Sequence, residues 1–248
     1  MPMLAAAGRR VIALDPRGTG DSDRPDSGYD MTTVAAEIHG LVDALRLRTD
    51  SKLDVVGHDV GAWIAYAYAA DWPNDVRRLA VFDSAIPGVT PPPPPGIPSA
   101  AANAKTWHFA FNRLDDLPEI LIRGHEREFL MWLFRAKAVR PWMIAPIDLD
   151  EYVRVLASPG ATRAAFAYYR AATSPEGIAQ SLERAKRKLS LPVLAFGAET
   201  GVGDALFHTM SLVAGDVRGG IITDCGHYLP EECPNTVARE ICHFMAVP

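Results

Sequence analysis

The sequence lacks the marks of several protein classes. Its three cysteines, Cys225, Cys233 and Cys242, are too few for a disulfide framework and are not spaced as zinc ligands. The formal net charge of −5 gives no basic surface for nucleic acid, and no apolar run is long enough to cross a bilayer. No charged start precedes the short apolar stretch within 1–10, so no signal peptide is visible. The hydrophobic content of 48% and the charged content of 22% are instead typical of a globular protein with a sizeable core.

The chain alternates between apolar runs and segments of helical spacing, which predicts a mostly parallel sheet with flanking helices. Buried strands are expected at 10–15, 53–57, 79–83, 191–197 and 220–223. Helices are expected at 32–45, 61–71 and 236–245. Together these elements indicate an α/β fold.

A proline-rich stretch interrupts the alternation. The five consecutive prolines Pro91–Pro95 can neither continue a helix nor join a sheet. From 100 to about 188 the pattern predicts helices only, and strands return after them. We therefore expect a first core segment over 1–87, a helical cap over 88–188 and a second core segment over 189–248.

The stretch Leu53–Trp63, LDVVGHDVGAW, has the pattern of a nucleophile elbow. Asp59 stands between an apolar run that ends in Gly57 and a helix that begins near Gly61. A carboxylate at this tip can attack an sp³ carbon and form an alkyl ester, whereas it cannot perform the chemistry of a serine esterase. The same residues are compatible with an ordinary strand-to-helix loop in which Asp59 caps the helix. The elbow alone leaves both roles open.

Acidic and histidine side chains follow three other predicted strands. Asp83 ends one strand, Glu199 follows another, and His227 lies in the turn DCGHYLPEE after the last one. In open α/β sheets the site lies beyond the carboxyl ends of the strands, so these side chains are expected near Asp59. A triad with either Asp83 or Glu199 as its acid is consistent with this placement.

These motifs together resemble one group of enzymes. VVGHDVGAW, DPRGTGDSDRP and DCGHYLPEE, with nucleophile, acid and histidine in that order, are similar to α/β-hydrolase-fold epoxide hydrolases and their haloacetate dehalogenase relatives. KTWHFAFN, LIRGHEREFL and FAYYRAAT extend the likeness through the cap. The whole pattern most resembles bacterial epoxide hydrolases of the cystic-fibrosis inhibitory-factor type. The resemblance implies an α/β-hydrolase fold with an inserted all-helical cap.

The resemblance also implies a two-step opening of an epoxide to a vicinal diol. Asp59 would attack the less hindered carbon and form a hydroxyalkyl ester, and His227 would activate the water that hydrolyses it. Asp83, which the resemblance favours over Glu199, would orient His227 and stabilise its imidazolium. The implied partners are a small epoxide and water, with no metal and no organic cofactor, and neither nucleic acid nor membrane is implied.

Two cap residues match the family pair that donates hydrogen bonds to the epoxide oxygen. They are His108 in WHF and Tyr169 in YYR, with Tyr168 as the alternative if the helix is rotated by one residue. Such donors are needed because the strained ether opens only when the developing alkoxide is stabilised. Val60, which follows the nucleophile, would supply one backbone N–H of an oxyanion hole.

A haloalkane or haloacetate dehalogenase is the alternative, because those relatives use the same Asp nucleophile. They place a Trp directly after it to hold the halide, or Arg residues after it to hold a carboxylate. Val60 and Trp63 stand at these positions here, so a carboxylate would lack its bidentate partner. These residues favour epoxide hydrolysis, although His108 and Tyr169 could also assist a departing halide.

The front of the family pattern is missing from this sequence. Members begin with N-terminal strands and an H-G-x-P loop, and neither occurs before 10–15 here. That loop supplies the second oxyanion-hole N–H, and losing such a donor costs about 10²–10³ in rate. An inactive truncated remnant or a binding module is therefore a third interpretation. The default expectation is a cytoplasmic protein. If a signal peptide was lost together with the N-terminal strands, we expect a periplasmic or secreted protein instead.

The resemblance further suggests a homodimer formed through the cap. In the inhibitory-factor type, the positions of Cys225 and Cys233 carry a disulfide. These two cysteines would form the same bridge here if the protein reaches an oxidising compartment.

Overall fold

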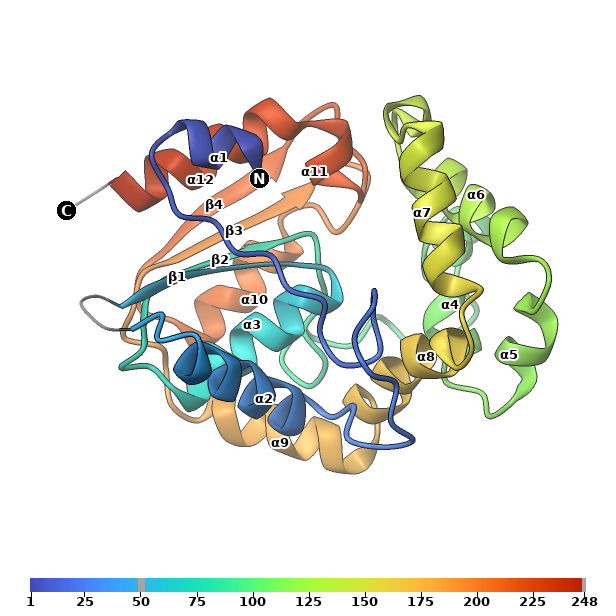
Figure 1. Cartoon of the computed structure of the whole chain (residues 1–248), viewed down its shortest axis with the longest axis horizontal. Coiled ribbons are helices and arrows are strands. Elements are labelled where there is room, and N and C mark those ends of the chain that lie inside the picture. The colour runs from blue at the N-terminus through green and yellow to red at the C-terminus, as the bar shows by residue number, and fades with distance from the viewer. Residues whose placement is uncertain (49–51, 247–248) are drawn as a thin grey trace.

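A parallel sheet forms the centre of the protein (Figure 1). The computed structural model describes residues 1–48 and 52–246, and within these ranges the strand order is β1-β2-β3-β4, with every neighbouring pair parallel. The strands are β1 (Leu53–His58), β2 (Val76–Phe82), β3 (Val193–Ala198) and β4 (Val217–Ile222).

Helices cover both faces of this sheet (Figure 1). One face carries α2 (Met31–Ala44), α3 (Val60–Asp71) and α10 (Ala205–Val213), and the other carries α1 (Pro2–Ala6), α11 (Leu229–Glu232) and α12 (Pro234–Ala246). Successive residues of β2 point to opposite faces, so Leu79 and Val81 join the first core while Ala80 and Phe82 join the second. Burial on both faces explains why residues 79–82 of β2 and most of β3 form continuous apolar runs. No helix within the described ranges is both long and apolar enough to cross a membrane.

A second group of helices lies between β2 and β3 in the chain. It comprises α4 (Ala100–Phe111), α5 (Leu117–Ile122), α6 (Glu126–Lys137), the 3₁₀ helix η1 (Pro141–Met143), α7 (Pro146–Leu156), α8 (Ala161–Ala172) and α9 (Pro175–Ala185). In Figure 1, α4 to α8 form a lobe beside the sheet, whereas α9 runs below α2. Arg184 of α9 ties that helix to the core, because its guanidinium lies 2.6 Å from the Asp71 carboxylate of α3. The helices-only pattern predicted for this part of the chain is confirmed.

The strand expected at 10–15 is wrong. This segment has irregular backbone, and its Ile12 and Leu14 side chains are 45% and 38% exposed. In the described part of the chain, β1 pairs with β2 alone, so 10–15 has no neighbouring strand to complete its hydrogen bonds. The other expected strands and helices are present with ends shifted by a few residues, and α10 was not predicted.

Candidate active site

Asp59 lies in a strained turn between β1 and α3. Its backbone has φ 51° and ψ −123°, an uncommon conformation for a residue other than glycine. Gly57 permits the close turn, because a Cβ there would lie 2.2 Å from the Gly61 oxygen. The end of β2 holds the backbone of Asp59: Asp59 N donates to Phe82 O at 3.1 Å, and Ser84 Oγ donates to Asp59 O at 2.9 Å. The capping alternative is wrong, since the Asp59 side chain makes no capping hydrogen bond to α3.

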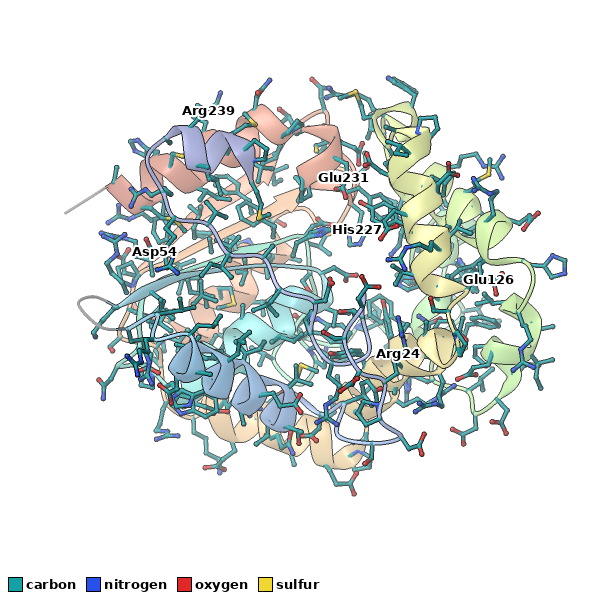
Figure 2. All side chains as sticks on the ribbon, in the orientation of Figure 1. Arg24, Asp54, Glu126, His227, Glu231 and Arg239 are labelled. Carbon is teal, nitrogen blue, oxygen red and sulfur yellow. The ribbon has the colours of Figure 1, made fainter. Side chains whose placement is uncertain are left out.

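Three side chains from separate strand ends meet at this turn. His227 Nδ1 lies 2.7 Å from Asp83 Oδ2, and His227 Nε2 lies 3.7 Å from Asp59 Oδ2. The Asp83 side chain is 1% exposed, and its Oδ1 accepts hydrogen bonds from Ala198 N at 2.7 Å and Val202 N at 3.0 Å. These donors fix the buried carboxylate against the imidazole. Figure 2 labels His227 at the end of the sheet that faces the cap helices.

The other acidic candidate, Glu199, is engaged elsewhere. Its Oε2 accepts a hydrogen bond from Asp224 N at 2.9 Å, which ties it to the turn that precedes His227. The geometry therefore puts Asp83, and not Glu199, in contact with the imidazole.

The charges of Asp59 and His227 stabilise one another. Burial opposes ionisation of Asp59, but the interaction with His227 outweighs it and lowers the pKa of Asp59 below its usual range. Burial likewise opposes the imidazolium, but Asp59 and Asp83 raise the pKa of His227 to about 9. Near neutral pH the site thus holds a carboxylate beside an imidazolium. The Asp59 side chain is still 31% exposed, so a reactant can reach it.

Two residues that the sequence did not single out hold the His227 turn. His58 Nε2 donates to His227 O at 2.7 Å. The Glu232 carboxylate is 1% exposed and binds the backbone on both sides of the boundary between cap and core. It accepts hydrogen bonds of 2.7–3.2 Å from the N–H groups of Val139, Arg140, Gly226 and Tyr228. Nothing in the local pattern distinguishes Glu232 from its neighbour Glu231, so only the tertiary structure identifies it.

The cap brings His108 and Tyr169 to the same side of the site. Their ring centroids lie 6.0 Å apart. Burial, aided by the negative charge of Asp59, raises the pKa of Tyr169 well above its usual value, so the phenol keeps its proton. Tyr168 is directed away, because its hydroxyl donates to Arg17 O at 2.7 Å. The helix phase thus places Tyr169, rather than Tyr168, within reach of the charge of Asp59.

A lysine that the sequence did not single out lies beside His108. Lys137 is the last residue of α6, and its Nζ lies 3.2 Å from His108 Nε2. Burial lowers the pKa of Lys137, although Asp59 and Asp83 oppose this shift. Burial and the Lys137 charge together lower the pKa of His108 to about 3, so its ring is neutral. Lysine is common at helix carboxyl ends, so no sequence signal marked this one.

Val60 begins α3 directly after Asp59. The first N–H groups of a helix have no acceptor within it, so the Val60 N–H suits the oxyanion role expected of it.

Cys225 and Cys233 are both free thiols in the structure, so the bridge expected in an oxidising compartment is absent here. The Cys233 thiol instead donates to Asp224 O at 3.8 Å. Burial and the adjacent Cys233 raise the pKa of Cys225, which favours the protonated thiol.

Known proteins share this architecture over nearly the whole chain. The sequence profile of the Alpha/beta hydrolase family matches residues 1–240. The chain is 34% identical over 240 residues to a soluble epoxide hydrolase of Corynebacterium sp. (strain C12), a match that covers 95% of this chain and 80% of the relative. Wild-type Cfl2 of Burkholderia cenocepacia superposes with a TM-score of 0.86 at 44% identity, covering 93% of this chain and 76% of that one. The ligand-free epoxide hydrolase CorEH gives a TM-score of 0.85 at 34% identity, covering 99% and 84% of the two chains. The chain therefore belongs to the alpha/beta hydrolase family, and it is a hydrolase with epoxide hydrolases among its close homologues.

Proposed function

We propose that the protein hydrolyses an epoxide to a vicinal diol through a covalent ester on Asp59. The observation that carries this proposal is a carboxylate at the elbow beside His227, whose other ring nitrogen contacts Asp83. A carboxylate nucleophile forms an alkyl ester when it attacks a saturated carbon. The soluble epoxide hydrolase that is 34% identical across 95% of this chain supports an epoxide as that carbon electrophile.

In the first step, an Asp59 oxygen attacks the less hindered epoxide carbon. The C–O bond of the ring breaks, and its electron pair passes to the epoxide oxygen. This oxygen needs hydrogen-bond donors and a proton as it becomes an alkoxide. Tyr169 keeps its phenolic proton beside Asp59, which supports it as one donor. The resemblance to the family assigns the second donor to the position of His108.

In the second step, water hydrolyses the ester. Neutral His227 takes a proton from water, and the oxygen adds to the carboxyl carbon of Asp59. The Val60 N–H is suited to bind the oxyanion that forms. When the intermediate collapses, the bond between this carbon and the alkyl oxygen breaks. The diol oxygen then takes the proton from His227, and Asp59, which is released as the carboxylic acid, passes its proton to the neutral imidazole and becomes a carboxylate again.

The ion pair between Asp59 and His227 supports this order of steps. While Asp59 is a carboxylate, it helps to raise the pKa of His227 to about 9, and the protonated ring cannot act as a base. Alkylation removes the negative charge of Asp59, so the pKa of His227 falls toward its ordinary value. The base therefore becomes competent only after the ester has formed.

The test traps the ester by removing the base. The His227→Gln variant is incubated with a terminal epoxide or with a haloacetate and examined by intact-protein and peptide mass spectrometry. We expect a mass gain equal to the whole epoxide, located on Asp59, and no gain in the Asp59→Asn control. A haloacetate adduct formed with loss of halide would identify a dehalogenase instead. A folded variant that gains no mass with either compound would refute the enzymatic proposal and favour the remnant or binding-module interpretation.

A further inference from the structure

The proposed donor Tyr169 packs against three aromatic rings. In the described part of the chain, its ring centroid lies 5.5 Å from that of Trp63, 5.7 Å from that of Phe109 and 6.0 Å from that of His108. The ring planes meet at angles between 71° and 83°, so each pair is edge-to-face, a favourable arrangement for aromatic side chains. Contacts with three rings restrict the Tyr169 ring and therefore the direction of its hydroxyl.

Of these three rings, Trp63 alone belongs to the core. His108 and Phe109 lie on α4 and Tyr169 lies on α8, so these three residues are all in the cap. Trp63 lies on α3, four residues after Asp59, which is the N-cap of that helix. The Trp63 ring therefore relates the position of the cap phenol to the core helix that begins at the elbow.

The core holds the Trp63 indole in one orientation. The side chain is 2% exposed, and its Nε1 donates to Ala85 O at 2.8 Å. Ala85 directly follows Ser84, whose Oγ donates to Asp59 O at 2.9 Å. Successive residues after β2 thus bind the backbone of Asp59 and the indole of Trp63. Because a buried N–H is costly to leave without an acceptor, the bond to Ala85 fixes how the indole lies.

We propose that Trp63 is a positioning residue that sets the Tyr169 hydroxyl against the epoxide oxygen while Asp59 attacks the ring carbon. This inference rests on the proposed epoxide hydrolysis. The phenol donates the hydrogen bond, and Trp63 fixes where the phenol lies. Alkylation is sensitive to this position, because a misplacement of about 1 Å can cost about 10²-fold in rate. Hydrolysis of the ester does not use the Tyr169 hydroxyl, so Trp63 should affect the first step alone.

The experiment is a double-mutant cycle on the alkylation step. In the His227→Gln parent, the rate of adduct formation with a terminal epoxide is followed by intact-protein mass spectrometry. Trp63→Leu should slow this step about 10-fold to 10²-fold, with the upper limit set by loss of the donor itself in Tyr169→Phe. When Tyr169→Phe is already present, Trp63→Leu should slow the step by less than about 2-fold, because no hydroxyl is left to position.

Two further variants separate positioning from a general loss of packing. Trp63→Phe keeps a ring beside Tyr169 but loses the hydrogen bond to Ala85 O, so we expect a smaller loss of rate than in Trp63→Leu. The cycle run with Trp63→Phe decides the question where Trp63→Leu does not fold. Trp72→Leu is the matched control, because Trp72 lies at the other end of α3, where its ring stacks on His39 at 4.5 Å. It should leave the alkylation rate unchanged.

The fate of the ester gives a second readout. In the chain that keeps His227, Trp63→Leu should slow formation of the ester but not its hydrolysis, so no ester should accumulate in mass spectra. An unchanged alkylation rate, equal losses with and without the Tyr169 hydroxyl, or an accumulated ester would each overturn the inference, since Trp63 would then not act through Tyr169. A His227→Gln parent that forms no adduct would refute the proposed function, and this inference with it.

Discussion

Replacement of Glu232 by Gln tests how the cap and the catalytic turn are joined. In the structure, Oε2 accepts from Val139 N, Arg140 N and Gly226 N, and Oε1 accepts from Tyr228 N. An amide can keep its oxygen toward the first three groups, but its NH₂ then faces Tyr228 N, and a buried donor loses its acceptor.

The expected loss in the free energy of unfolding follows from these four hydrogen bonds. A buried donor without an acceptor costs about 1–3 kcal/mol. The three remaining bonds lose the carboxylate charge, which weakens each by about 1 kcal/mol. We therefore expect Glu232→Gln to lower the free energy of unfolding by about 4–6 kcal/mol, a large share of the stability of an ordinary domain.

The assay is urea unfolding followed by circular dichroism, with linear extrapolation to water. Glu231→Gln is the matched control, since Glu231 accepts from the Tyr152 hydroxyl at 3.1 Å and an amide oxygen can keep that bond. We expect the control to lose less than about 1 kcal/mol, as a substitution that keeps its hydrogen bond does. Equal losses in the two variants would refute the assignment of Glu232 as the joint between cap and core.

Three further predictions concern the chemistry of the site. Asp83→Asn should leave alkylation intact but slow hydrolysis of the ester about 10⁴-fold, as the same change does in other triads. The ester should therefore accumulate and be visible by mass spectrometry, and rapid turnover would contradict this role of Asp83. Tyr169→Phe should slow alkylation about 10²-fold in the His227→Gln background, and an unchanged rate would remove Tyr169 from the donors. His227 has a folded pKa of about 9 against an ordinary 6.5, so its ion pairs stabilise the fold fully below pH 6.5, and this contribution is lost as pH rises to 9. Thermal melts across this window should show a smaller pH dependence for Asp59→Asn than for the wild type.

The sequence predicted those site residues whose position follows from a local pattern. Asp59 stands in a strand–turn–helix pattern, and Asp83 and His227 follow strands, so the carboxyl edge of a parallel sheet brings them together. The strand at 10–15 was predicted wrongly because an apolar run records hydrophobicity, whereas a strand also requires a neighbour with free backbone groups.

The cap side of the site was less accessible to sequence reasoning. Helical spacing does not say which polar residue of a cap helix faces Asp59, and only the packed structure separates Tyr169 from Tyr168. Lys137 and Glu232 gain their places through contacts with residues distant in the chain. Charged residues at such positions are ordinarily solvated, so composition and periodicity gave no reason to select them.

Residues 82–84, at the end of β2 and directly after it, position both the Asp59 turn and the His227 imidazole. Phe82 O and Ser84 Oγ bind the backbone of Asp59, and Asp83 between them binds His227. This one segment therefore positions both Asp59 and the His227 imidazole. A redesign of the sheet, or a graft of this site onto another fold, should therefore keep residues 82–84 together. Loss of the Ser84 hydroxyl would remove one of the two hydrogen bonds that connect this segment to the backbone of Asp59.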